Sequence, residues 1–144
     1  MKKLFLFAVL AAAFSATKMN AQIPESKPDP SAPVIKFKVD TMNFGSVTQG
    51  TVVERDFTFK NTGKSPLIIT ETRVTCGCTT PDYPKDPIAP GKTGTIHVRF
   101  NSAGKLGAQD KTITIVSNNG SGEVVLHLKG TVTSPPPTPA PAGN

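Results

Sequence analysis

The sequence has no tryptophan and only one tyrosine, two histidines and two cysteines among 144 residues. Its eight phenylalanines must therefore supply most of the aromatic part of a core. A tetrahedral zinc site would need both cysteines and both histidines. His97 and His127 fall on the polar faces of separate expected strands, so we interpret both as solvent-facing and assign no metal site to them.

Motifs of the common enzyme classes are also missing. The chain has no Gly-x-Ser-x-Gly elbow, Walker loop or His-Glu-x-x-His pair. Its ten acidic residues include no close pair of the glycosidase kind. The foldable stretch, Val34–Thr133, is too short for a Rossmann or TIM-barrel scaffold. We therefore expect no enzyme, no catalytic residues and no cofactor.

The positive charge is spread thinly along the chain. The formal net charge is +6, and three of the lysines lie within the first 21 residues, which carry no acid. The other basic residues are interleaved with acids and form no stripe with aromatic residues between them. Nucleic acid is therefore not an expected partner.

The first 21 residues have the pattern of a secretory signal peptide. Lys2 and Lys3 precede an apolar run at Leu4–Phe14, and small residues lead to an expected cleavage after Ala21. Eleven apolar residues are too few for a membrane span, which needs about 17–25. We expect a periplasmic or secreted protein with no stable membrane insertion after cleavage.

Proline-rich segments flank the foldable region on both sides. Residues 22–33 are interpreted as a linker and residues 134–144 as a disordered, extended tail. The expected domain is residues 34–133, between these segments.

The domain shows strand patterns throughout and no useful helical periodicity. Apolar and polar residues alternate, which places one side of each strand on a core. Phe57 and Phe59 should face inward, with Arg55 interrupting that side. The pattern predicts an all-β, immunoglobulin-like antiparallel sandwich of about seven strands, with a small barrel as the alternative. The first and last of the alternating segments are candidate edge strands; the segments are Val34–Val39, Val52–Lys60, Thr93–Phe100, Lys111–Val116 and Val124–Thr133.

One motif could carry chemistry, the run from Cys76 to Pro81, which reads Cys-Gly-Cys-Thr-Thr-Pro. In a regular strand, residues i and i+2 lie about 6.6 Å apart, whereas the Cβ atoms of a disulfide lie about 3.5–4.5 Å apart. A bond from Cys76 to Cys78 therefore requires a bend at Gly77. Closing so short a loop contributes only about 1.6 kcal/mol on the chain-entropy model.

Three interpretations of this motif stay open. The cysteines could form a local clasp or a packed thiol pair, a redox-active dithiol, or ligands for a soft metal ion. Arg73 is the nearest basic residue in sequence that could favour a thiolate. The candidate site residues are Cys76 and Cys78, with Gly77, Thr79 and Pro81 as the supporting motif.

Taken in order, the motifs resemble a family of small secreted bacterial domains, the domain of unknown function numbered fifteen-seventy-three, common in Bacteroidota. The resemblance covers about Phe37–Val132 and rests on an ordered set of motifs: Phe57-x-Phe59-x-Asn61-x-Gly63, Cys76-Gly77-Cys78-Thr79-x-Pro81, Ile88-x-Pro90-Gly91 and Leu126-x-Leu128-x-Gly130-x-Val132. It implies an immunoglobulin-like sandwich related to major-sperm-protein and ASPM–SPD-2–Hydin domains, with no established activity. Related pilus chaperones bind partners by adding a strand at a sheet edge, an analogy of fold alone.

The favoured hypothesis is an exported, monomeric, non-catalytic module that binds or scaffolds a protein or another component of the cell envelope. The alternative is a thiol-redox or soft-metal-handling protein centred on the Cys-Gly-Cys motif. The sequence does not identify the partner.

Overall fold

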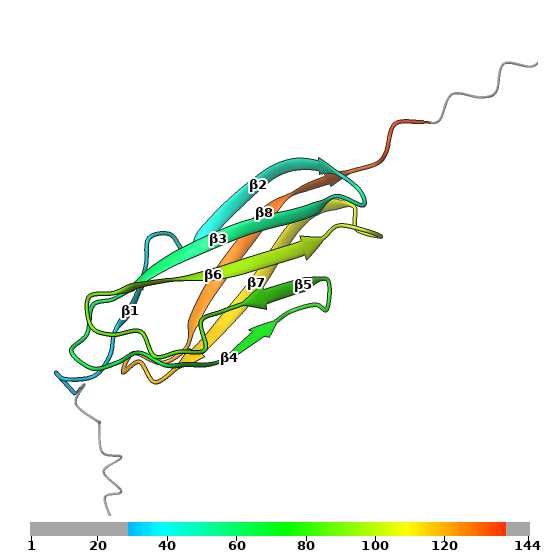
Figure 1. Cartoon of the computed structure of the whole chain (residues 1–144). Helices are drawn as coiled ribbons and strands as arrows, with labels where there is room; N and C mark the ends of the chain where they lie inside the picture. The colour runs from blue at the N-terminus through cyan, green and yellow to red at the C-terminus, as the bar shows by residue number, and fades with distance from the viewer. Residues whose placement is uncertain (1–28, 138–144) are drawn as a thin grey trace, which may run out of the picture.

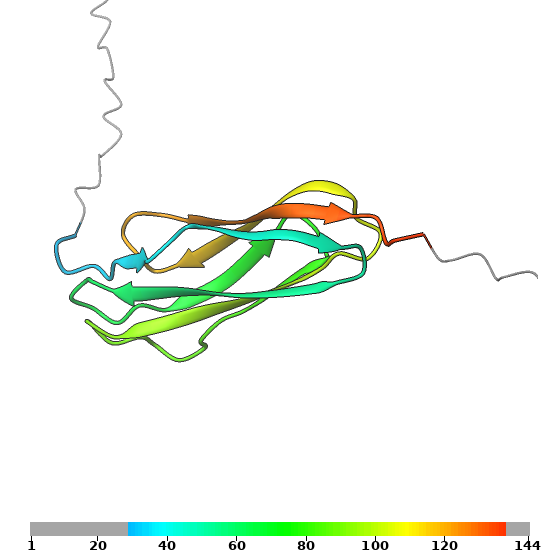
Figure 2. The same cartoon turned by 90° about the horizontal axis from the view of Figure 1, so that it is seen from above.

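Eight strands form two four-stranded sheets that pack face to face in the computed structural model, which describes residues 29–137 (Figures 1 and 2). One sheet has the order β1-β3-β6-β5 and the other the order β2-β8-β7-β4. The strands are β1 (Ile35–Phe37), β2 (Thr41–Thr48), β3 (Val52–Asn61), β4 (Ile69–Val74), β5 (Thr79–Asp82), β6 (Thr93–Asn101), β7 (Gly107–Ser117) and β8 (Val124–Thr133). The predicted all-β, immunoglobulin-like sandwich is confirmed.

The pairing of β8 differs from the expectation for the last strand. We predicted edge positions for the first and last segments, and β1 does end its sheet. The prediction was wrong for β8, which lies between β7 and β2. It pairs antiparallel with β7 but parallel with β2. The chain crosses from β1 to the second sheet and runs alongside β8, so the last strand in sequence becomes an interior one.

The alternation pattern did not indicate β2, because the strand buries little. Phe44 is its one buried residue, and its other side chains are exposed or half-buried. The pairing with β8 shifts register between Asn43 and Ser46, and Gly45 adopts a φ of 76° at that bulge. A left-handed φ of this kind favours glycine. Because β2 is a bulged edge strand with one buried side chain, its sequence does not show the alternation of apolar and polar residues from which a strand is predicted.

The core lies between the sheets, on the faces that the alternation assigned to it. Phe57 and Phe59 are fully buried, which confirms their predicted orientation, and Arg55 on the same strand is exposed. The remaining core comes mainly from strands that the pattern had indicated; its fully buried side chains include Ile96, Val98, Phe100, Ile113, Ile115, Leu126 and Leu128.

A buried amide organises one end of the sandwich. Asn61 is fully buried at the end of β3, and its Nδ2 donates to the carbonyls of Ser65 at 2.8 Å and Ile88 at 2.9 Å. Its Oδ1 accepts from the backbone N–H groups of Gly63 at 3.0 Å and Val34 at 3.3 Å. One side chain thus connects the start of β1 to two loops.

Several sequence-based expectations lie outside the described residues. These are the signal peptide at 1–21, the linker up to residue 28 and the tail from residue 138. The parts of the linker and tail that are described, 29–33 and 134–137, contain no strand. Between residues 29 and 137, no helix is long and apolar enough to cross a membrane.

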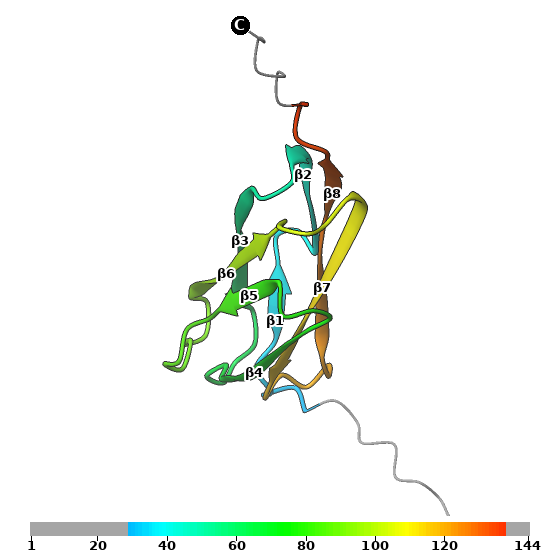
Figure 3. The same ribbon diagram turned by 90° about the vertical axis from the view of Figure 1, so that its right-hand side faces the viewer.

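The described chain enters the sandwich at one end of its long axis and leaves at the opposite end (Figures 1 and 3).

Candidate functional site

The Cys-Gly-Cys motif forms a tight turn where the chain crosses from the sheet of β4 to the sheet of β5. The structure joins Cys76 and Cys78 in a disulfide, with Cα atoms 5.3 Å apart. Both cysteines are half-buried, whereas Gly77 is exposed. The glycine has no positive φ, and an added Cβ would meet no atom within 4 Å. The bend therefore does not depend on the special conformations of glycine.

Backbone hydrogen bonds hold both arms of this turn, one leading from β4 and the other leading into β5. Asn101 N donates to Cys78 O at 2.9 Å, and Thr79 N donates to Cys76 O at 3.2 Å. On the other arm, Thr75 N donates to Thr112 O at 3.4 Å. The arms thus keep their places in two different sheets through contacts that do not involve sulfur.

Thr79 is the motif residue closest to the sulfur chemistry. Its side chain is buried, with 3% of the residue exposed, and β5 begins there opposite Phe100. The Thr79 hydroxyl lies 3.8 Å from Cys76 Sγ and 4.0 Å from Cys78 Sγ. No other hydrogen bond of this hydroxyl is found within the described chain. It is therefore a buried donor directed at both sulfurs.

Pro81 has a structural role in the motif. It is half-buried in β5, opposite Val98. Proline lacks an N–H to donate and is confined to edge strands or bulges, and β5 is the last strand of its sheet. The residue thus fits an edge that accepts no further strand.

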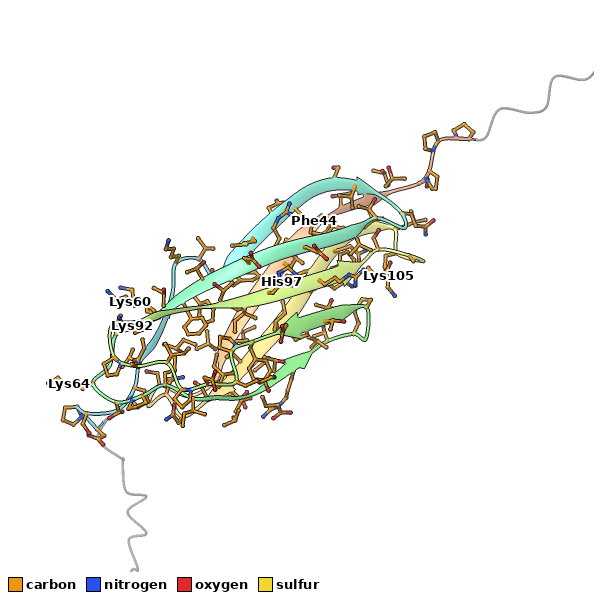
Figure 4. All side chains as sticks on the ribbon, viewed as in Figure 1. Phe44, Lys60, Lys64, Lys92, His97 and Lys105 are labelled. Atoms are coloured by element: carbon orange, nitrogen blue, oxygen red, sulfur yellow. A yellow bond between two sulfur atoms is a disulfide. The ribbon has the colours of Figure 1, made fainter. Side chains whose placement is uncertain are left out.

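A polar cleft opens beside the turn. Gly77 and Cys78 line it together with Thr80, Arg99, Asn101, Ala103 and Lys105. The cleft lies at the end of the molecule that holds the β4–β5 loop, where Lys105 projects from the β6–β7 connection (Figure 4). The register of β5 and β6 puts Thr80 directly opposite Arg99.

The two basic side chains of the cleft differ in how their charge is balanced. Arg99 Nε lies 3.6 Å from Glu54 Oε1, a long and exposed pair. Lys105 is half-buried and forms no ion pair within residues 29–137. The cleft next to Cys78 therefore carries positive charge.

Arg73, the basic residue that sequence reasoning placed near the cysteines, is engaged elsewhere. Its guanidinium lies 3.3 Å from Glu71 and 2.9 Å from Glu123. These carboxylates raise the pKa of Arg73, chiefly through the hydrogen bond to Glu71. The sequence signal for Arg99 was its place on the polar face of an alternating strand. Nothing in the local pattern pointed to Lys105.

The histidines lie on the outer faces of different sheets and each contacts one aspartate. His97 Nδ1 is 2.6 Å from Asp56 Oδ1, and His127 Nδ1 is 2.9 Å from Asp110 Oδ1. His97 lies midway along β6 (Figure 4). Within the described part of the chain, no group of three or more His, Cys, Asp or Glu side chains could hold a metal ion.

The sheet edges are the other candidate site, and most of them are protected. β1 has three residues and includes Lys36, and β5 has four and includes Pro81. The part of β3 beyond β1 carries Glu54, Arg55 and Asp56. β4 carries Glu71 and Arg73, and the Tyr83 hydroxyl donates to its Thr70 carbonyl at 3.2 Å. Short strands, charges, proline, β-bulges and covering segments are the usual means of blocking strand addition.

β2 has fewer of these protections. Its eight residues, Thr-Met-Asn-Phe-Gly-Ser-Val-Thr, include no charge and no proline. His127 N donates to Asp40 O, and Gln49 N donates to Thr133 O. Backbone groups alternate in direction along a strand, so those of Thr41, Asn43 and Ser46 point away from β8. The bulge divides this edge into two short segments.

Comparison with known proteins identifies the family. Residues 35–132 match the family described as protein of unknown function, DUF1573. The chain belongs to this family. The membership confirms the resemblance drawn from the motifs. No curated protein matches the chain in sequence.

Solved structures share the fold. A protein of unknown function from Porphyromonas gingivalis W83 is similar, with a TM-score of 0.63 and 15% identity, over 76% of this chain and 50% of that one. The PapD-like domain 7 of human CEP192 has a TM-score of 0.60 and 9% identity, over 81% of this chain and 97% of that domain. The secreted serine protease VesC from Vibrio cholerae has a TM-score of 0.55 and 16% identity, over 69% of this chain and 23% of the protease. This chain thus spans only half of the first protein and under a quarter of the protease. At these identities the likeness shows the fold alone.

Proposed function

We propose that this DUF1573 protein is an exported, monomeric, non-catalytic binding module that accepts an extended segment of a partner protein along β2. The observation that carries the proposal is the contrast among the edges. β1, β3, β4 and β5 are short, charged, capped or interrupted by proline, whereas β2 is long, uncharged and proline-free. An extended peptide that adds to such an edge gains main-chain hydrogen bonds.

The chemistry of this edge also describes the partner segment. Outward-pointing backbone groups at Thr41, Asn43 and Ser46 supply affinity without regard to sequence. A shallow hollow over β2, β8 and β7 is lined by small polar side chains, among them Asn43, Ser46 and Thr131, and by Asp110 and Lys129, which pair with each other. We therefore expect a segment of extended, uncharged residues, with the bulge at Gly45 setting its length to a few residues on either side.

A displayed library of unstructured random peptides provides the probe. Peptides selected on the wild-type protein should bind Ser46→Ala normally, because alanine keeps the backbone N–H. They should bind Ser46→Pro about tenfold or more weakly, because proline removes the outward donor of an edge strand. Circular dichroism would establish that both variants fold.

Hydrogen exchange on the wild-type complex gives a readout that does not depend on folding of the proline variant. Bound peptide should slow exchange of the Thr41, Asn43 and Ser46 amides. Protection confined to another edge, equal binding by the alanine and proline variants, or failure to select any peptide would each overturn the proposal.

A further inference from the structure

The disulfide turn combines three features that a simple clasp does not need. The two cysteines are half-buried, positive charge lines the cleft beside Cys78, and a buried hydroxyl is directed at both sulfurs. We propose that Cys76 and Cys78 form a redox-active disulfide, which exchanges electrons with a protein dithiol approaching through the cleft of Arg99 and Lys105.

The hydroxyl of Thr79 favours the reduced state. A disulfide sulfur is a weak hydrogen-bond acceptor, whereas a thiolate is a charged one, and hydrogen bonds to charged groups are the stronger kind. The Thr79 side chain is buried, and among residues 29–137 only the two sulfurs lie within reach as side-chain partners. Its donor is thus poorly used while the disulfide is closed and well used once a thiolate forms.

The cleft favours the same state. Arg99 and Lys105 line the same cleft as Cys78, which also packs against the core, and Lys105 has no carboxylate partner in the described chain. Basic neighbours stabilise thiolates over thiols. The same charges would attract an incoming thiolate toward Cys78.

The fold can tolerate opening of the bond. The disulfide closes a loop with a sequence separation of only two, so it restricts the unfolded chain very little. β4 stays paired with β7, and β5 stays paired with β6, through backbone hydrogen bonds alone. Disulfides that are exposed are more readily reduced than buried ones, and this one is half-buried at the surface of the turn.

The exchange proceeds in two steps. A thiolate of the partner attacks Cys78 Sγ; a mixed disulfide forms, the bond between the two cysteines breaks, and Cys76 leaves as a thiolate beside the Thr79 hydroxyl. The partner's second thiolate then attacks the partner sulfur that is bonded to Cys78, which closes the partner's disulfide and releases Cys78 as a thiolate. The partner dithiol is oxidised to a disulfide by two electrons, and the pair in this protein gains those electrons and two protons.

Equilibration of the purified protein with glutathione buffers at neutral pH tests the thermodynamic part, with alkylation and intact mass as the readout. Arg99→Gln and Lys105→Gln should each shift the equilibrium about threefold toward the disulfide, and the double variant about tenfold, which corresponds to about 30 mV. Thr79→Val should shift it in the same direction. Lys60→Gln, at the opposite end of the molecule (Figure 4), is the matched control and should leave it unchanged.

Equilibria that are unchanged in all four test variants, or a disulfide that dithiothreitol does not reduce while the domain stays folded, would overturn the proposal. Single-cysteine variants test the order of attack. The free thiol is Cys78 in Cys76→Ser and Cys76 in Cys78→Ser. Cys78 should react with a neutral disulfide reagent about tenfold faster than Cys76, because Cys78 lines the basic cleft. The reverse order would disprove the role assigned to Cys78.

This proposal stands apart from strand addition at β2. A Cys76→Ser/Cys78→Ser protein should bind the selected peptides with wild-type affinity, since β2 and β4, the strand that leads into the disulfide turn, lie at opposite edges of their sheet. Loss of redox activity and loss of peptide binding are therefore separable results.

Discussion

Replacing Asn61 by alanine should destabilise the domain more than any other polar-to-alanine change described here. The side chain is fully buried and makes four hydrogen bonds to backbone groups. At about 0.5–1.5 kcal/mol for each bond, the expected loss in unfolding free energy is about 2–6 kcal/mol. The upper part of the range applies if water does not reach the abandoned carbonyls of Ser65 and Ile88.

The measurement is urea unfolding followed by far-ultraviolet circular dichroism, because the chain has no tryptophan for fluorescence. Asn118→Ala is the matched control. Its amide also bridges two backbone groups, Ile68 N at 2.8 Å and Pro66 O at 3.1 Å, but the residue is exposed. Its loss should stay near 1 kcal/mol, because water can replace the partners.

Asn61→Asp sharpens the test. The substitution replaces two donors by an oxygen that faces the carbonyls of Ser65 and Ile88, and it buries a charge. Burial raises the pKa of a carboxyl group in the folded state, so this variant should be least stable at neutral pH and should recover partly as the pH falls. The reasoning about the amide network is refuted if Asn61→Ala costs no more than Asn118→Ala.

Three further predictions concern the core and the surface charges. Phe57→Ala should cost about 3–5 kcal/mol in a denaturant melt, since the ring is fully buried; a loss near zero would contradict the packing. Gly130→Ala should cost about 1–3 kcal/mol, because the new Cβ would collide with the Phe44 ring, whereas Gly77→Ala, whose Cβ meets nothing, should be near neutral; equal melting of the two variants would argue against this contact. The hydrogen bonds from His127 and then Lys129 lower the pKa of Asp110. The stabilising effect of this carboxylate is therefore present above the unfolded-state pKa of about 3.9 and is lost as the pH falls through the lower folded value. Asp110→Asn should flatten the dependence of stability on pH below about pH 4, and an unchanged profile would exclude this role.

The sequence was sufficient to predict the strands that supply the core. β3, β6 and β8 bury alternate side chains for much of their length, and β7 does so at Ile113 and Ile115, so a period of two was visible in their sequences. β2 escaped prediction because it packs mainly through Phe44 and is bulged at Gly45. Sheet order was equally hidden, since nothing in the composition of β8 records that a strand some 80 residues earlier would pair with it in parallel.

The residues around the disulfide likewise include some that the sequence could identify and some that only the fold brings together. The Cys-Gly-Cys-Thr motif is local, so its cysteines and the adjacent Thr79 could be identified from the sequence. Arg99 and Lys105 reach the motif through the pairing of β5 with β6 and through the following loop. Arg73 is nearer in sequence but pairs with Glu71 on its own strand, β4, and with Glu123 just before β8. Proximity along the chain was therefore a poor guide to the charges around the sulfurs.

The parallel pairing of β2 with β8 has a mechanical consequence. The two ends of the described chain leave the sandwich at opposite ends of its long axis (Figure 1). Tension that reaches β2 from the amino-terminal side and β8 from the carboxyl-terminal side would slide one strand along the other. The hydrogen bonds between them, from Asp40–His127 to Gln49–Thr133, would then bear the load together and not break one after another. The domain is thus arranged to resist stretching when it is held between two attachment points.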